Sequence, residues 1–79
     1  MDRKQILMEY IEEDILKGKN SDISADDDLF VLGILNSLSI LQLVAFIDER
    51  FEYQIPDEDV VFENFQSVST LEDYLSENL

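Results

Sequence analysis

One serine stands out among the residues that could do chemistry. The segment GILNSLSILQLV, residues 33–44, places Ser37 between an asparagine and an apolar run. A nucleophilic serine needs a neighbouring base to accept its proton, and the 79 residues contain neither histidine nor cysteine. Nucleophilic catalysis by a Ser–His or Cys–His pair is therefore excluded within this chain. Disulfides and thiolate metal sites are excluded as well.

Carboxylates are the other groups that could act. An EF-hand loop requires glycine at its sixth position and glutamate at its twelfth, and counting from Asp22 these positions hold Asp27 and Gly33. We therefore predict a solvated, helix-capping loop and no metal site. Acid–base work by paired carboxylates requires a cleft that shifts their pKa values, for which so short a chain has little room. We expect no catalytic residue, and a small acid-based or metal-dependent enzyme is the least favoured hypothesis.

The charge is strongly negative and unevenly distributed. The formal net charge is -14, and Arg50 is the one basic residue after position 20. The other four basic residues lie near the start: Arg3, Lys4, Lys17 and Lys19. Such a field repels nucleic acid and anionic membranes and attracts basic protein surfaces, although acidity can also serve solubility alone. With no signal peptide and no apolar run long enough to span a bilayer, we predict a cytoplasmic protein that binds neither nucleic acid nor membrane.

The spacing of apolar residues predicts helices throughout one domain, residues 1–79. A first helix runs from Asp2 to about Lys17, and Gly18 suits a left-handed cap after it. Its apolar side is formed by Leu7, Met8, Ile11 and Ile15. A long connection follows over residues 19–35, and we expect its apolar residues to hold it against the bundle. These are Ile23, Leu29, Phe30, Leu32, Ile34 and Leu35.

The second helix starts at Asn36, a strong N-cap residue. Helical spacing places one face in the core: Ile40, Leu43, Val44, Ile47 and Phe51. A second, narrower stripe lies beside Ser37: Leu38, Leu41 and Ala45, flanked by Asp48 on one side and by Gln42 and Glu49 on the other. Either this stripe packs against the apolar loop, or it is an exposed surface that docks into partners.

Two further elements complete the prediction. A short helix starts at residues 57–59 and buries Val60, Val61, Phe62 and Phe65. A last helix starts near Ser69 or Thr70, with Ser69 and Glu72 as a capping box. Its apolar face comprises Leu71, Tyr74, Leu75 and Leu79. The fold class is all-α, a small four-helix bundle with three main helices, a short third helix and a long loop between the first two.

The aromatic residues are interpreted as packing groups. They are Tyr10, Phe46, Phe51, Phe62, Phe65 and Tyr74. A platform on which nucleic-acid bases stack also requires a cationic groove, and the negative charge argues against one.

At Ser37 the pattern becomes specific. The segment from Asp28 to Phe51 resembles the acyl and peptidyl carrier proteins, whose signature is a serine followed by leucine at the start of the second helix. The resemblance covers most of the chain, including DDLF before the loop, IPDED at residues 55–59 and the short last helix. It implies that Ser37 is the attachment point for 4'-phosphopantetheine, transferred from coenzyme A by a phosphopantetheinyl transferase. The thiol of that group would carry an acyl or aminoacyl thioester.

The resemblance also implies where partners bind. Leu38, Leu41 and Ala45 match the family's apolar contact positions. Positions where the family commonly carries acids for basic enzyme partners are occupied by Gln42, Asp48 and Glu49, of which Gln42 departs by being neutral. The sharper departure is Asn36, because the commonest motif of the family has aspartate at this position. Asparagine can still cap the helix, but it removes one negative charge beside the serine. The loss of that charge bears on recognition by some transferases.

Two functions of different classes follow. The leading hypothesis is a stand-alone monomeric carrier, not an enzyme, that presents its cargo to loading enzymes and downstream synthases. The alternative is an acidic helical interaction module that binds a basic partner without a prosthetic group.

Residues 36–38 and 59–65 also resemble discrete carriers of unusual malonyl-type extender units. A helix N-terminus favours an adjacent phosphodiester by about half a kcal/mol at an exposed site.

Overall fold

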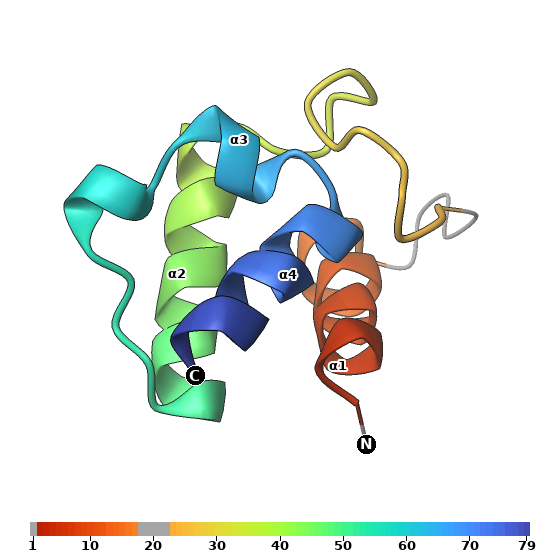
Figure 1. The fold of residues 1–79 in the computed structure, drawn as a ribbon. Helices are drawn as coiled ribbons and strands as arrows, with labels where there is room; N and C mark the ends of the chain where they lie inside the picture. The colour runs from red at the N-terminus through yellow and green to blue at the C-terminus, as the bar shows by residue number, and fades with distance from the viewer. Residues whose placement is uncertain (1, 18–22) are drawn as a thin grey trace.

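A computed structural model describes residues 2–17 and 23–79 of the chain (Figure 1). This part of the chain contains four α-helices and the connections between them. They are α1 (Arg3–Tyr10), α2 (Ser37–Phe51), α3 (Phe62–Phe65) and α4 (Val68–Asn78). A π-helical turn, Ile11–Ile15, continues α1, and a 3-10 turn, Asp57–Asp59, precedes α3. The predicted all-α bundle with three main helices and a short third is confirmed. No helix in the described ranges is long and apolar enough to span a membrane.

The first helix has the predicted extent but an unexpected end. The Asp2 carboxylate accepts a bond from the Gln5 amide at 2.9 Å and caps α1. After Tyr10 the helix widens, and the Leu16 amide donates to the Ile11 carbonyl, five residues back, at 2.8 Å. Lys17 then takes the left-handed conformation with φ of 54°. The cap predicted at Gly18 lies outside the described residues.

The core draws on all four helices and on the connections between them. Helix α4 packs against α1, and Phe46 of α2 stacks on Tyr10 of α1 with 4.1 Å between ring centroids. The predicted core face of α2 is buried at Leu43 and Ile47 and half-buried at its edges. The buried apolar side chains are Leu7, Ile11, Leu29, Ile34, Leu35, Leu43, Ile47, Ile55, Phe65, Val68, Leu71 and Leu75.

Leu29 joins the long connection to the opposite side of the bundle. Its amide donates to the Gln66 carbonyl at 2.8 Å, between α3 and α4. Its own carbonyl accepts bonds from the amides of Ile34 and Leu35 at 2.9 and 3.1 Å, and its side chain is fully buried. The backbone of this one residue therefore links the α3–α4 junction to the residues that lead into α2.

Asp28 reinforces this junction. Its carboxylate accepts bonds from the amides of Val31 and Phe30 and from Nε2 of Gln66, at 3.0, 2.9 and 3.1 Å. The bond from Val31, with those from Gln66 and Phe30, holds the pKa of the Asp28 carboxyl below its usual value. The ionised carboxylate thus orders the turn before α2.

One loop residue does not pack as predicted. The Leu32 amide bonds to the Asp28 carbonyl at 3.1 Å and the Gly33 amide to the Phe30 carbonyl at 3.0 Å, which closes a tight turn. Gly33 supplies a φ of 73°. Leu32 lies at the tip of this turn and is 53% exposed, so the prediction that it packs against the bundle is wrong. Leu29, Ile34 and Leu35 are buried as predicted.

The predicted short helix is divided by a turn. The Val61 amide donates to the Asp59 carbonyl at 2.9 Å, and Val60 has φ of -82° and ψ of 76°. Val60 packs against the core, whereas Val61 and Phe62 are exposed, contrary to prediction. Because α3 is a single turn, only Phe65 of this helix reaches the buried core.

The last helix starts earlier than predicted. Ser67 is the N-cap, and its hydroxyl accepts a bond from the Thr70 amide at 3.1 Å. Starting at Val68 buries that side chain in line with Leu71 and Leu75, which the predicted start would not have done. The predicted Ser69–Glu72 capping box is therefore wrong.

Ser69 and Glu72 make tertiary contacts instead. The Ser69 hydroxyl donates to Asp26 Oδ1 at 2.7 Å. The carboxylate of Glu72 pairs with Arg3 Nε at 3.1 Å. Both contacts join α4 to segments distant in sequence.

We expect Asp28→Ala to lower the urea midpoint of unfolding, because three donors lose their acceptor. Since folding depresses the pKa of Asp28, the stabilisation should be complete above about pH 4, the ordinary aspartate value, and should disappear as the pH falls through the lower folded value. Asp73→Ala removes the same charge from an exposed position on α4 and serves as control. Equal midpoints for the two variants at pH 7 would contradict this role.

Candidate functional site

Ser37 is the first residue of α2 and is exposed. Asn36 precedes it in an extended conformation with φ of -140° and caps the helix as predicted. Its Oδ1 accepts a bond from the Ser39 amide at 3.0 Å, and its carbonyl accepts one from the Ile40 amide at 2.9 Å. The amides of Ser37 and Leu38 have no acceptor within the described residues, so the first turn of α2 leaves two donors available to a ligand.

The position of Ser37 is fixed from both sides. Before it, Ile34 and Leu35 are buried and bonded to the Leu29 carbonyl. After it, α2 is held by α1, because the Tyr10 hydroxyl donates to the Gln42 carbonyl at 3.3 Å in addition to the ring stacking on Phe46. Ser37 is thus an exposed group on a rigid support.

The second stripe of α2 is exposed, so the alternative in which it packs against the loop is wrong. Leu38 and Leu41 are 66% and 63% exposed. Together with the neighbouring exposed residues they form what we call the outer face of α2: Leu38, Leu41, Gln42, Ala45, Asp48 and Glu49. The core of the bundle therefore uses only one face of α2, and the two leucines of the second stripe are left to solvent.

Exposed apolar residues also occur outside α2, and some of them, such as Leu32 and Phe62, were predicted to be buried. Val31 and Leu32 lie in the turn before α2, and Phe62 at the start of α3 is 51% exposed. The Phe62 ring contacts Phe30 with 4.8 Å between centroids, which places α3 against this turn. In Figure 1, α3 lies beside the N-terminal half of α2. The signal for an exposed tip was Gly33, which permits the tight turn.

The surroundings of Ser37 suit a group acceptor better than a nucleophilic catalyst. The chain has no histidine that could act as its base, and the Asp28 carboxylate is engaged by three donors. Among residues 2–17 and 23–79 no cluster of three or more potential metal ligands is present. A phosphodiester on the Ser37 hydroxyl would lie at the positive end of α2 beside the two available amides. The residues present therefore fit a phosphopantetheinyl group.

We expect Asn36→Ala to lower the free energy of unfolding by about 1 kcal/mol, because the Ser39 amide loses its cap. Asn36→Asp should stay within about 0.5 kcal/mol of the parent protein, since aspartate caps equally well and suits the helix dipole. Urea unfolding at pH 7 measures both values. Gln42→Ala, at an exposed position within the same helix, is the control. The capping role is refuted if Asn36→Ala and Gln42→Ala are equally stable.

Comparison with known proteins agrees with this geometry. A family model described as the phosphopantetheine attachment site matches residues 5–75. A chain from a crystal structure described as that of an FAD-dependent dehydrogenase is 35% identical, with a TM-score of 0.81. The match covers 87% of the present chain and 97% of that chain. The chain belongs to the phosphopantetheine-binding family of carrier proteins, whose members bear 4'-phosphopantetheine as a covalent group.

Proposed function

We propose that residues 1–79 act as a monomeric carrier that bears 4'-phosphopantetheine on Ser37. The observation that carries the proposal is the exposure of Ser37 at the capped start of α2, beside two amides without acceptors. The group supplies a thiol at the end of a long arm, on which acyl or aminoacyl cargo is held as a thioester. Enzymes that load and elongate the cargo then work on it outside the bundle.

Attachment requires little chemistry from the carrier itself. In the transferase, Ser37 Oγ bonds to the phosphorus that bears the pantetheine arm of coenzyme A, and the bond from that phosphorus to the bridging oxygen of the diphosphate breaks. The transferase takes the serine proton, and the nucleotide portion leaves. The chain contributes an exposed hydroxyl, a fixed position and the dipole of α2, so no base is needed near Ser37. We accordingly propose that the protein is not itself an enzyme.

The outer face of α2 and Asn36 are proposed as the recognition surface for the transferase and for the biosynthetic enzymes. Leu38, Leu41 and Ala45 offer apolar contact, and Asp48 and Glu49 lie farther along the same helix. Acidic side chains around an apolar centre favour fast, salt-sensitive encounter with basic enzyme surfaces. Residues 31, 32 and 62, in the turn before α2 and at the start of α3, are further exposed apolar residues.

The cargo class is proposed from the sequence resemblance. Residues 36–38 and 59–65 resemble discrete carriers of malonyl-type extender units, which favours a short acyl cargo of that kind. Selection of the cargo belongs mainly to the loading enzyme.

Incubation of the apo protein with coenzyme A and a broad-specificity phosphopantetheinyl transferase should add one phosphopantetheinyl group, seen by intact mass. Ser37→Ala should abolish the addition, because no acceptor hydroxyl remains there. Ser39→Ala is the matched control: this hydroxyl lies two residues farther along α2 but is buried, so modification should persist. No addition with several transferases would instead support the module without a prosthetic group.

Leu41→Asp should lower kcat/KM of the transferase by about tenfold, because a charge replaces a central apolar contact, equivalent to about 1.4 kcal/mol. The helical circular dichroism should be unchanged, since Leu41 is exposed. Gln54→Asp adds a charge at an exposed position beyond the end of α2 and should leave kcat/KM within twofold, about 0.4 kcal/mol. Unfolding of Leu41→Asp would show that Leu41 is a packing residue and would defeat the recognition proposal.

A further inference from the structure

The chain segment around Ser37 carries no charge, although the protein as a whole is strongly acidic. Residues 29–47 contain no aspartate, glutamate, lysine or arginine, whereas the chain has 19 acidic and 5 basic residues. This neutral segment comprises the turn before α2, the Asn36 cap and α2 as far as Ile47. The attachment site therefore lies within an uncharged part of the sequence.

Much of the neutral segment is exposed to solvent. Leu38 and Leu41 are 66% and 63% exposed, and Val31 is 80% exposed. Exposed positions of soluble domains commonly carry charged side chains. Here they hold apolar or uncharged polar residues: Val31, Leu32, Gly33, Asn36, Ser37, Leu38, Leu41, Gln42 and Ala45. The lack of charge is thus a property of the surface and not only of the core.

Acidic residues lie at the borders of the neutral segment. The carboxylate of Asp28, directly before it, is engaged by three donors. On the α3 side, Asp59 accepts the Tyr74 hydroxyl at 2.6 Å, and Glu63 is exposed in the single turn of α3. Glu63 is thus the exposed acid at this border.

The acids of the first helical segment lie on a different side of α2. Glu9, Glu13 and Asp14 line a hollow together with Phe46. Because an α-helix has 3.6 residues per turn, the side chains of Leu41 and Phe46 point about 140° apart. These acids therefore do not face Leu41.

The outer face of α2 becomes charged only beyond Ile47, where Asp48 and Glu49 are exposed. With a rise of 1.5 Å per residue, Asp48 lies about 16 Å along the helix from Ser37. The Debye length at physiological ionic strength is about 8 Å, so the charge of Asp48 is largely screened at the serine.

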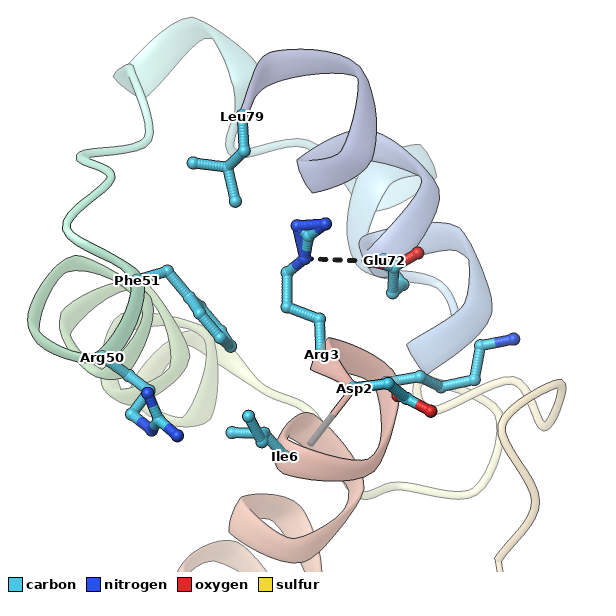
Figure 2. Close-up of a pocket in the computed structure, with 8 residues that line it drawn as sticks. Asp2, Arg3, Ile6, Arg50, Phe51, Glu72 and Leu79 are labelled. Carbon is cyan, nitrogen blue, oxygen red and sulfur yellow. Dashed lines mark ion pairs between the residues drawn. The ribbon is translucent and has the colours of Figure 1, made fainter.

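The other charged residue of α2 also lies in its last turn. Arg50 lines an open hollow with Phe51, the start of α1 and the end of α4, where Arg3 pairs with Glu72 at 3.1 Å (Figure 2). The charged groups of α2 are therefore concentrated at the end opposite Ser37.

We propose that the enzymes acting at Ser37 contact the exposed residues of the neutral segment through an uncharged, apolar surface, and that their basic groups lie opposite Asp48 and Glu49. This proposal rests on the proposed function and specifies the partner surface. A basic group set against Leu38 or Leu41 would lose its hydration without gaining a carboxylate, which is unfavourable. The acids farther along α2 speed the encounter, and the apolar contact beside the serine holds the complex.

An enzyme is favoured over a second copy of the chain as the occupant of this surface. The neutral segment contains Ser37, so a stable dimer through it would cover the hydroxyl that the transferase has to reach. Two copies would also bring together two sets of acids at residues 48, 49 and 63, which repel one another.

Two variants of Leu41 isolate the effect of charge. Leu41→Gln and Leu41→Glu have side chains of the same length and shape, and both lose the same apolar contact. The kcat/KM of the broad-specificity transferase should be about fivefold or more lower for Leu41→Glu than for Leu41→Gln, because its carboxylate meets an uncharged surface. A basic partner surface at this position would reverse the order. The circular dichroism of both should match that of the parent, since Leu41 is exposed.

The matched control is Gln54→Glu, which makes the same charge change at an exposed position beyond the end of α2 and should leave kcat/KM within about twofold of the parent. The double variant Asp48→Asn/Glu49→Gln should lower kcat/KM by about threefold or more at low salt. It should equal the parent within about twofold at 1 M NaCl, where the Debye length is about 3 Å. The ratio between the two Leu41 variants should persist at 1 M NaCl, because desolvation is not screened.

The proposal is overturned if Leu41→Glu is modified as fast as Leu41→Gln or faster, or if their difference disappears at 1 M NaCl. A parent protein that is dimeric by light scattering at the assay concentration, and monomeric as Leu41→Glu, would make a second copy the occupant and would overturn it too. Prolonged incubation should still add one phosphopantetheinyl group to every variant that keeps Ser37. Absence of that group from the parent would refute the proposed function, whereas a reversed order with full modification refutes only the uncharged partner surface.

Discussion

The backbone of Leu29 is the constraint on which the site depends. A domain this small has only a small core with which to hold a long loop. The buried polar groups of the loop also need hydrogen-bond partners, because leaving them unpaired is costly. Leu29 donates to Gln66 on one side and accepts from Ile34 and Leu35 on the other, while its side chain fills the core. The α3–α4 junction, the loop and the start of α2 are thereby joined, and Asn36 enters the helix from a fixed direction.

The faces of helix α2 differ in burial, and its two ends differ in the groups that they expose. Leu43 and Ile47 hold it in the core, and the outer face is left exposed. At its start the helix dipole and two unbonded amides favour a negative group on Ser37. At its end, Arg50 and Phe51 line an open hollow together with the start of α1. The same helix thus combines a buried face, an exposed face and a start that favours a negative group.

Side-chain spacing predicted much of this arrangement. The i, i+3 and i+7 recurrence in residues 36–51 separated the buried face from the exposed stripe, and the asparagine before Ser37 identified the cap. Both are local properties, since each follows from the helix period and from one amide within reach of one side chain. The absence of a base for Ser37 was also evident from composition alone.

Other features depended on contacts between distant segments. Ser67, not Ser69, caps α4, because an earlier start buries Val68 and leaves the Ser69 hydroxyl for Asp26. Leu32 and Phe62 are exposed because of the turns at residues 28–33 and 59–61. The hollow that Arg3 and Arg50 line is a tertiary feature too, since these two residues are 47 positions apart in sequence. The sequence by itself determined the helical class, the Asn36 cap and the serine that follows it. The tertiary structure alone decided which apolar and charged side chains meet, because burial and proximity depend on how the helices pack.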